Sequence, residues 1–214
     1  KLVFTMSDGN NFHIYEITLN GLENRSGTAR RITPDTHQYV HHYDPAYAPD
    51  GSIIFCSTAS YQTVPCWHGK YQGSNLFRIE GDGTDMRMLT NDQALVYTPV
   101  TLTSGQIMYS RWNYVGTAHQ YYRTIMLMNP DGTGQRSIAG INSWWPPAIM
   151  HARSVPGYEH IIVGIALGHH GARRIGRLMR YDVSKGSREA MGVIELPSGE
   201  KPVAEIADAL VYED

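Results

Sequence analysis

Short hydrophobic runs separated by turn residues recur along the whole chain. The runs Ser52–Phe55 and Gln106–Tyr109 both follow turn segments that contain glycine with serine or aspartate. Long stretches with the 3.6-residue period of an amphipathic helix are missing. Short strands at regular spacing with turn signals between them are typical of all-β proteins. The pattern therefore predicts an all-β fold.

Alignment of the chain with itself reveals two repeated hairpins. Residues 45–55 align without gaps on residues 99–109, a shift of 54 positions, and residues 75–89 align on residues 124–138, a shift of 49 positions. Each segment is a strand, a tight turn and a second strand. Two hairpins per repeat give four strands, and about 40–50 residues per four-stranded unit is typical of a β-propeller blade. The repeats predict a propeller of four-stranded antiparallel blades.

Weaker copies flank these repeats. Residues 13–17 with residues 31–33 form the outer hairpin of an earlier blade, whose second strand is Leu2–Met6 and whose first strand is missing. Segments 161–164 and 176–182 supply a fourth blade. The predicted divisions are a partial blade at 1–37, blades at 38–91, 92–142 and 143–196, and a tail at 197–214. Because even small propellers need four complete blades, we expect the ring to be completed by other segments of a longer polypeptide or by a partner chain.

Three phrases resemble TolB-type propeller repeats: Asp44–Gly51, the pair Asn75–Ile79 and Asp82–Thr84, and Asn129–Thr133. Three further features narrow the resemblance, namely Tyr109–Tyr114, Val64–Cys66 and Gly168–His170. Over residues 39–190 the chain resembles the propeller (middle) domain of the hydrazine synthase alpha subunit family. In that enzyme the domain packs against c-type haem domains and contributes residues beside a haem and a zinc ion. The resemblance implies an extracytoplasmic location, periplasmic or secreted.

The chain differs from the enzyme at the positions that would attach a haem or bind its iron. It contains no Cys-x-x-Cys-His haem attachment motif, and residues 171–174 after the histidine pair hold no tyrosine that could bind iron. These departures weigh against hydrazine chemistry, while the fold relationship is unaffected. A haem would have to be supplied by another domain.

Placing the segments on blades with strands a to d separates two faces. The a–b and c–d turns lie on what we call the first face, and the b–c loops and blade-to-blade connections lie on the second face. The first face receives the plain turns 49–51, 82–84, 104–105 and 131–133. The second face receives the long connections 36–43, 59–74, 111–123, 141–147 and 168–175.

The second face collects the residues that suggest recognition. All four tryptophans and seven of the ten histidines fall there. Binding residues concentrate in loops on a rigid scaffold, and tryptophan and arginine are frequent anchors. The candidates for binding a cofactor or other ligand are His41, His42, Arg111, Trp112, Arg173 and Arg174. The alternative is that the histidines bond backbone carbonyls and that the arginine pair belongs to a solvated loop.

A metal site is a further hypothesis on this face. Cys66 comes from one b–c loop, and His169 and His170 come from another. Thiolate and imidazole ligands together favour zinc over calcium or magnesium. The alternative is that the histidines cap strand ends. The other cysteine, Cys56, follows Phe55 inside a predicted strand and is expected to be a small buried hydrophobe, with a Cys56–Cys66 disulfide as the alternative.

Composition narrows the function classes. Basic and acidic residues number 18 and 20, so net charge favours neither nucleic acid nor a membrane surface. No stretch approaches the roughly 20 apolar residues of a membrane-spanning helix. The chain opens at Lys1 without a methionine, and we expect it to be a mature or excised piece.

The sequence leaves two hypotheses for the function of the chain. The first is a scaffold or binding module of a larger protein, which uses the second face to bind a partner domain, cofactor or metal. The second is part of a metal- or haem-dependent redox enzyme, and no catalytic residue can be assigned. A propeller that gates a serine peptidase is disfavoured because the chain has no Gly-x-Ser-x-Gly motif.

Overall fold

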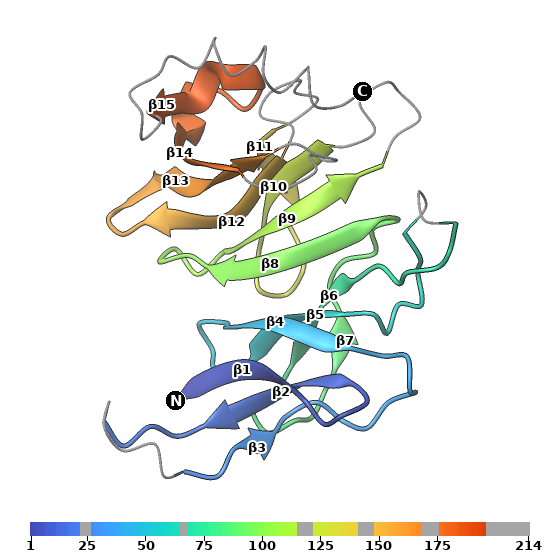
Figure 1. Ribbon diagram of the computed structural model, residues 1–214. Coiled ribbons are helices and arrows are strands. Elements are labelled where there is room, and N and C mark those ends of the chain that lie inside the picture. Colours follow the sequence, from blue (N-terminus) through green and yellow to red (C-terminus); the bar gives the residue numbers. More distant parts are fainter. Residues whose placement is uncertain (22–26, 65–67, 115–121, 141–147, 168–175, 196–214) are drawn as a thin grey trace. The chain divides into compact units, whose positions relative to one another are not determined.

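A computed structural model describes residues 1–21, 27–64, 68–114, 122–140, 148–167 and 176–195 (Figure 1). Nearly all regular elements in these residues are strands. The exceptions are two short 3₁₀ helices, η2 (Val183–Lys185) and η3 (Glu189–Gly192). Within the described ranges, no helix has the length and apolar character needed to cross a lipid bilayer.

The first sheet contains three strands in the order β1-β2-β3. They are β1 (Leu2–Ser7), β2 (Phe12–Ile17) and β3 (Arg30–Arg31). Strands β1 and β2 pair antiparallel from Leu2↔Ile17 to Ser7↔Phe12. The strand β1 corresponds to the second strand of the predicted blade and lies at the edge of this sheet. A complete blade would have its first strand beside that edge. This is the incomplete blade that the sequence predicts.

The second sheet is a four-stranded antiparallel blade in the order β4-β5-β6-β7. Its strands are β4 (His42–Tyr47), β5 (Ile53–Ser57), β6 (Asn75–Ile79) and β7 (Arg87–Met88). Every residue of β5 is buried, because its two faces pack against neighbouring layers. The β4–β5 turn passes through Gly51, whose φ of 89° suits glycine.

The remaining strands form two further sets of four. One set is β8 (Leu95–Thr101), β9 (Ile107–Asn113), β10 (Tyr122–Met128) and β11 (Arg136–Ala139). The other is β12 (Ala148–Val155), β13 (Tyr158–Leu167), β14 (Arg177–Asp182) and β15 (Val193–Glu195). The sheet order is β15-β14-β13-β12-β10-β9-β8, with β11 paired to β10. A parallel pair between Arg123 and Ala148 joins β10 to β12.

The chain divides into two compact units. The N-terminal unit comprises residues 1–101 and 130–132, and the C-terminal unit comprises residues 102–129 and 133–214. A core cluster in the N-terminal unit lies between the first two sheets and contains Ile14, Ile32, Ile53, Phe55, Phe77 and Ile79. The C-terminal unit has its own core, which includes Met108, Ile125, Ile149, Ile162, Met179 and Tyr181.

The predicted fold class is confirmed. The protein is an incomplete β-propeller of antiparallel four-stranded blades with a partial first blade, and the described part of residues 39–140 contains no helix. The exact boundaries at 38, 92 and 143 stay predictions. The predicted tail at 197–214 lies outside the described residues. Cys56 is a fully buried free thiol, as expected of a small core residue.

Candidate functional site

Two adjoining pockets open on the second face of the N-terminal unit. Their walls come from the β1–β2 turn, the connection from β3 to β4 and the loop between β5 and β6. We call them the aromatic pocket, with a cavity volume of about 600 Å³, and the polar pocket, of about 570 Å³. Tyr39 lines both. Both volumes fall in the range of small-molecule sites.

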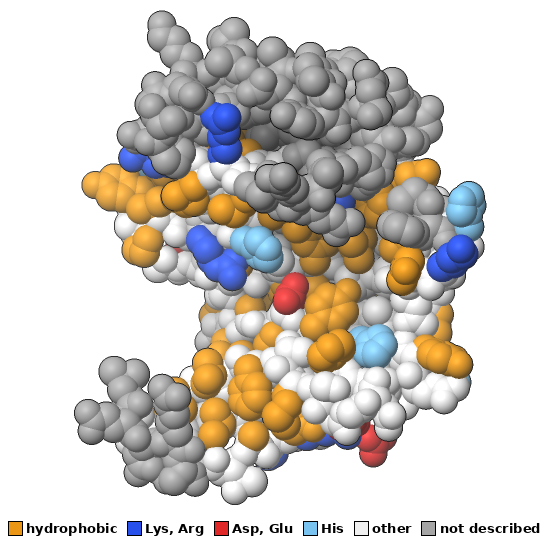
Figure 2. Space-filling view, in the orientation of Figure 1, with side chains coloured by type: hydrophobic (Ala, Val, Ile, Leu, Met, Phe, Trp, Pro, Cys, Tyr) orange, Lys and Arg blue, Asp and Glu red, His pale blue; other side chains and the backbone are white. Residues whose placement is uncertain are grey.

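The aromatic pocket combines rings with polar groups. Its rings are Phe12, Tyr39, His41, Tyr43 and Tyr71, and its other lining residues are Thr5, Asp44, Thr58, Lys70 and Gln72. Around the start of β4, histidine and hydrophobic side chains lie together on the surface with an acidic side chain nearby (Figure 2). Opposite charges on Asp44 and Lys70 leave the lining without a net charge preference.

The polar pocket is lined by amides, hydroxyls and carboxylates. Its members are Asp8, Gly9, Asn10, Asn11, His13, Asp35, Thr36, Gln38 and Tyr39. The Oγ1 atom of Thr36 is buried without a hydrogen-bond partner among the described residues. A buried polar atom of this kind normally has a partner.

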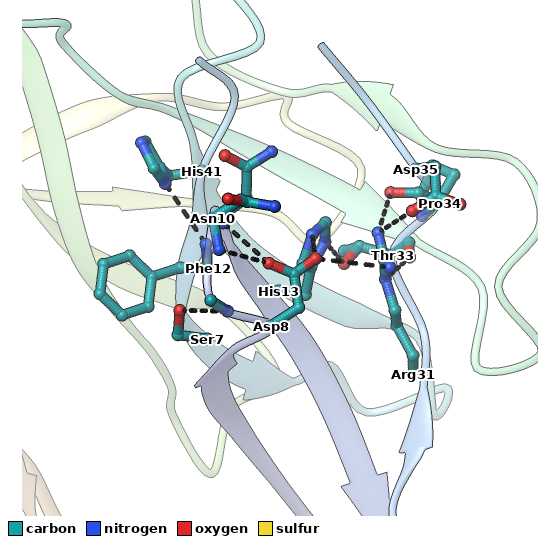
Figure 3. Close-up of polar contacts among 12 residues, drawn as sticks. Ser7, Asp8, Asn10, Phe12, His13, Arg31, Thr33, Pro34, Asp35 and His41 are labelled. Carbon is teal, nitrogen blue, oxygen red and sulfur yellow. Dashed lines mark hydrogen bonds and ion pairs between the residues drawn. The ribbon is translucent and has the colours of Figure 1, made fainter. Parts of the chain in front are cut away.

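The β1–β2 turn is built by its own side chains (Figure 3). Oδ1 of Asp8 accepts hydrogen bonds from the backbone N–H groups of Asn10 and Asn11, both at 2.9 Å. Ser7 Oγ accepts a third from Gly9 N at 3.1 Å. The two backbone hydrogen bonds to Asp8 lower the pKa of its carboxyl group. The turn therefore presents a fixed carboxylate to the polar pocket.

His13 lies between the turn and the chain that leaves β3 (Figure 3). Its Nε2 atom is 3.2 Å from Asp8 Oδ2, and its Nδ1 atom is 3.2 Å from Thr33 Oγ1. The N–H group of Ile14 donates to Thr33 Oγ1 at 3.1 Å, so the hydroxyl hydrogen of Thr33 is free to point at Nδ1. Burial lowers the pKa of His13. The neutral ring can therefore donate to Asp8 and accept from Thr33.

Arg31 fixes the connection that enters the polar pocket. Its guanidinium group donates to the carbonyl oxygens of Thr33 at 3.0 Å and Pro34 at 3.1 Å. It also forms an ion pair of 2.7 Å with Asp35. These bonds hold the segment that carries Thr36 against the first sheet.

The adjacent histidines His41 and His42 have different surroundings. His41 lines the aromatic pocket, and its Nδ1 atom accepts a hydrogen bond of 3.3 Å from Phe12 N. His42 is completely buried between the rings of His13 and Phe55, at centroid distances of 5.8 and 5.4 Å. It lines neither pocket. Burial lowers the pKa of His42 to about 3, with help from the positive charge that His13 and Arg31 can carry.

Arg111 and Trp112 are neighbours on β9 of the C-terminal unit. Trp112 is buried; its ring makes an edge contact with Tyr114 at 5.5 Å and has the Arg123 guanidinium over it at 5.3 Å. Arg111 Nε donates to Asn113 Oδ1 at 2.7 Å. In this position Trp112 contributes to packing within the unit.

The other candidates lie outside the described residues. They are Cys66, His169, His170, Arg173 and Arg174. In the part of the chain that the structure describes, no group of three His, Cys, Asp or Glu side chains is placed to hold a metal ion.

Several pocket residues were not among the sequence candidates. Asp8, Phe12 and His13 come from the turn and strand of the partial blade, and Tyr39 and Tyr71 lie in the connections 36–43 and 59–74 that the sequence assigns to the second face. The sequence pattern could have identified the turn, because residues 7–11 join strands b and c of the partial blade and b–c loops belong to the second face. The recognition residues considered in the sequence are tryptophan, arginine and histidine, and this choice leaves tyrosine out.

Comparison with known proteins shows the fold. Hydrazine synthase from Kuenenia stuttgartiensis matches with a TM-score of 0.65 and 15% identity, over 85% of this chain and 29% of that one. TolB from Acinetobacter baumannii matches with a TM-score of 0.56 and 15% identity, over 85% of this chain and 37% of that one. Puromycin hydrolase matches with a TM-score of 0.56 and 13% identity, over 94% and 28%.

At these identities the likeness shows a TolB-like propeller fold and no particular activity. The chain spans 28–37% of the length of these three structures. No protein-family model matches the sequence, and no curated protein matches it.

Proposed function

We propose that the chain is a scaffold and binding module of a larger extracytoplasmic protein, and that its second face binds a partner domain, a cofactor or a metal ion. The two adjoining pockets of the N-terminal unit are the observation that carries this proposal. Pockets of this size are suited to binding a small organic group. Other domains of the same polypeptide, or a partner subunit, would contact the surrounding loops.

The contrast between the two faces of the N-terminal unit supports the proposal. On the first face, Asp50 Oδ1 accepts from Ser52 N at 3.1 Å, and Asp82 Oδ1 accepts from Thr84 N at 2.9 Å. These turns satisfy their own polar groups. On the second face, the β1–β2 turn is closed in the same way, but exposed rings line the aromatic pocket beside it.

The extracytoplasmic location rests on the family resemblance of the sequence. Within the same proposal, zinc is the metal that Cys66, His169 and His170 would hold, since thiolate and imidazole are its preferred ligands. A haem would come from another domain.

A ligand screen on the full-length protein tests the binding role. Thermal-shift measurements with a small-molecule library are expected to give hits that the variant Tyr39→Ala loses and the variant Tyr158→Ala keeps. Tyr158 is a matched control because it is equally exposed, 61% against 58% for Tyr39, and belongs to the C-terminal unit. A screen without any hit that depends on Tyr39 would contradict the proposal for these pockets.

Elemental analysis tests the metal. Zinc in the purified full-length protein is expected to be lost in the variant Cys66→Ser, because the thiolate ligand is removed. The buried thiol Cys56 provides the control, and Cys56→Ala is expected to retain zinc. Equal zinc contents in wild type and Cys66→Ser would contradict the assignment.

A further inference from the structure

The aromatic pocket exposes rings that contribute little to the core. Phe12, Tyr39 and Tyr71 keep 48%, 58% and 58% of their surface exposed. All three line one hollow. Clustered exposed apolar surface marks an interaction site. The electron-rich face of an aromatic ring attracts the weakly positive C–H groups that sit on one side of a sugar ring.

The polar groups around these rings include both donors and acceptors. Lys70 donates, Asp44 accepts, and Gln72 does both in the aromatic pocket. Asn10 and Gln38 add amides in the polar pocket. A ligand with many hydroxyl groups suits such a lining, because each hydroxyl both donates and accepts.

The charged residues that line the two pockets favour neither of two other ligand classes. A quaternary ammonium ion also binds between aromatic rings, but Lys70 in the same lining offsets the attraction that Asp44 would exert on it. An acidic sugar would meet Asp8 and Asp35 in the polar pocket, where the single guanidinium group of Arg31 balances only one of the two carboxylates. A neutral ligand does not depend on a net charge in either pocket.

We propose that the two pockets form one groove for a neutral oligosaccharide, with Tyr39 between the two halves. Sugar rings stack on Phe12, Tyr39 and Tyr71, and the amides of the polar pocket bind sugar hydroxyls. Tyr39 lines both pockets, so a chain of several sugars that crosses this ring would reach both. This inference rests on the proposed function, since it names the ligand class for the same face.

Calorimetric titration of the full-length protein provides the test. The probes are neutral tetrasaccharides of glucose, xylose, mannose and N-acetylglucosamine, together with tetragalacturonate and tetramethylammonium. At least one neutral probe is expected to bind, and Tyr39→Ala is expected to weaken that binding at least tenfold. Tyr158→Ala is expected to leave the affinity unchanged. Circular dichroism of both variants verifies folding, and Phe12→Ala provides a second exposed position with an expected loss of affinity.

The remaining outcomes overturn the inference. They are no binding of any neutral probe, equal binding by wild type and Tyr39→Ala, and binding of only tetragalacturonate or tetramethylammonium. If no neutral probe binds but the small-molecule screen finds ligands of another class that depend on Tyr39, the proposed binding function stands and the oligosaccharide assignment fails. If neither experiment finds a Tyr39-dependent ligand, both proposals fail for this groove.

Discussion

At the scale of single residues, His42 is a polar side chain in an apolar core. Its ring is fully buried against His13 and Phe55, and neither ring nitrogen has a hydrogen-bond partner in the described structure. Removing a polar group from water without a compensating bond costs about 1–3 kcal/mol by mutational measures. His42 is therefore tolerated by the fold at some cost in stability.

Replacing His42 is expected to change both stability and its pH dependence. The folded-state pKa of about 3 lies below the ordinary value of 6.5, so the unfolded chain binds more protons between these values. The free energy of unfolding of the wild type therefore falls as the pH drops through this window, by up to about 1.4 kcal/mol per pH unit from this group. His42→Leu is expected to gain about 1 kcal/mol at pH 7 and to lose this slope.

Urea denaturation of the full-length protein between pH 7 and pH 4 measures both quantities. The exposed His37 is the control, and His37→Leu is expected to keep the wild-type slope. Identical slopes in wild type and His42→Leu would show that burial of His42 does not govern the acid sensitivity.

At the scale of elements, the first strand of each four-stranded blade repeats an irregularity. Asp44, Thr98 and His151 have positive φ values of 51°, 52° and 53°, and they lie 54 and 53 positions apart. Register shifts between Tyr43 and Ala46 and between Met150 and Arg153 accompany two of them. A residue in this conformation bends the strand as a β-bulge does. Each four-stranded blade thus repeats a residue with positive φ in its first strand as well as the strand pattern. In the first complete blade this residue is Asp44, which lines the aromatic pocket.

The β6–β7 turn is held by the first sheet. Arg30 donates to the carbonyl oxygen of Gly81 at 2.6 Å, and a Cβ atom on Gly83 would lie 2.9 Å from the carbonyl oxygen of Ile32. The Gly83 backbone also has a φ of 95°. Two separate reasons, conformation and close approach, therefore require glycine here.

A comparison with Gly51 separates these two reasons. Gly51 has a similar φ of 89°, but nothing lies within 4 Å of a Cβ atom there. Gly51→Ala is expected to lower the free energy of unfolding by about 1 kcal/mol through backbone strain alone. Gly83→Ala is expected to lose roughly 1–2 kcal/mol more, because the methyl group also forces the backbone of Ile32 to shift. Chemical denaturation of both variants measures the difference, and equal losses would show that the contact with Ile32 relaxes freely.

At the scale of the whole molecule, the propeller is incomplete. Among the residues that the structure describes, the first sheet has three strands, and β1 pairs with β2 alone. An unpaired strand edge exposes backbone N–H and C=O groups and readily accepts another strand. The geometry of the partial blade thus leaves a place for its first strand.

We expect a further strand to pair with the outer edge of β1 in the full-length protein. Hydrogen exchange measures this directly. Amides of β1 are expected to exchange slowly, since the added strand would bond those that face outward. The outermost strand β7, whose outer edge is solvent-exposed in a complete propeller, is expected to exchange faster and serves as the reference. Equally fast exchange in both strands would contradict the expectation.

The sequence by itself determined the blade pattern. Short hydrophobic runs, tight turns and two ungapped internal alignments depend on local chemistry, so the four-stranded blades and their partial first member could be predicted from it. The same logic assigned the long connections to one face, where both pockets lie. Tyr39 and the β1–β2 turn follow from that rule, although their roles were not anticipated.

Only the tertiary structure decided what each side chain on that face does. His41 and His42 are adjacent and identical in type, but successive residues of extended chain point to opposite sides. Packing of His42 against Phe55 and against His13 from another sheet buries it, which leaves His41 in the pocket. Burial depends on neighbours that are distant along the chain, and local pattern carries no information about them.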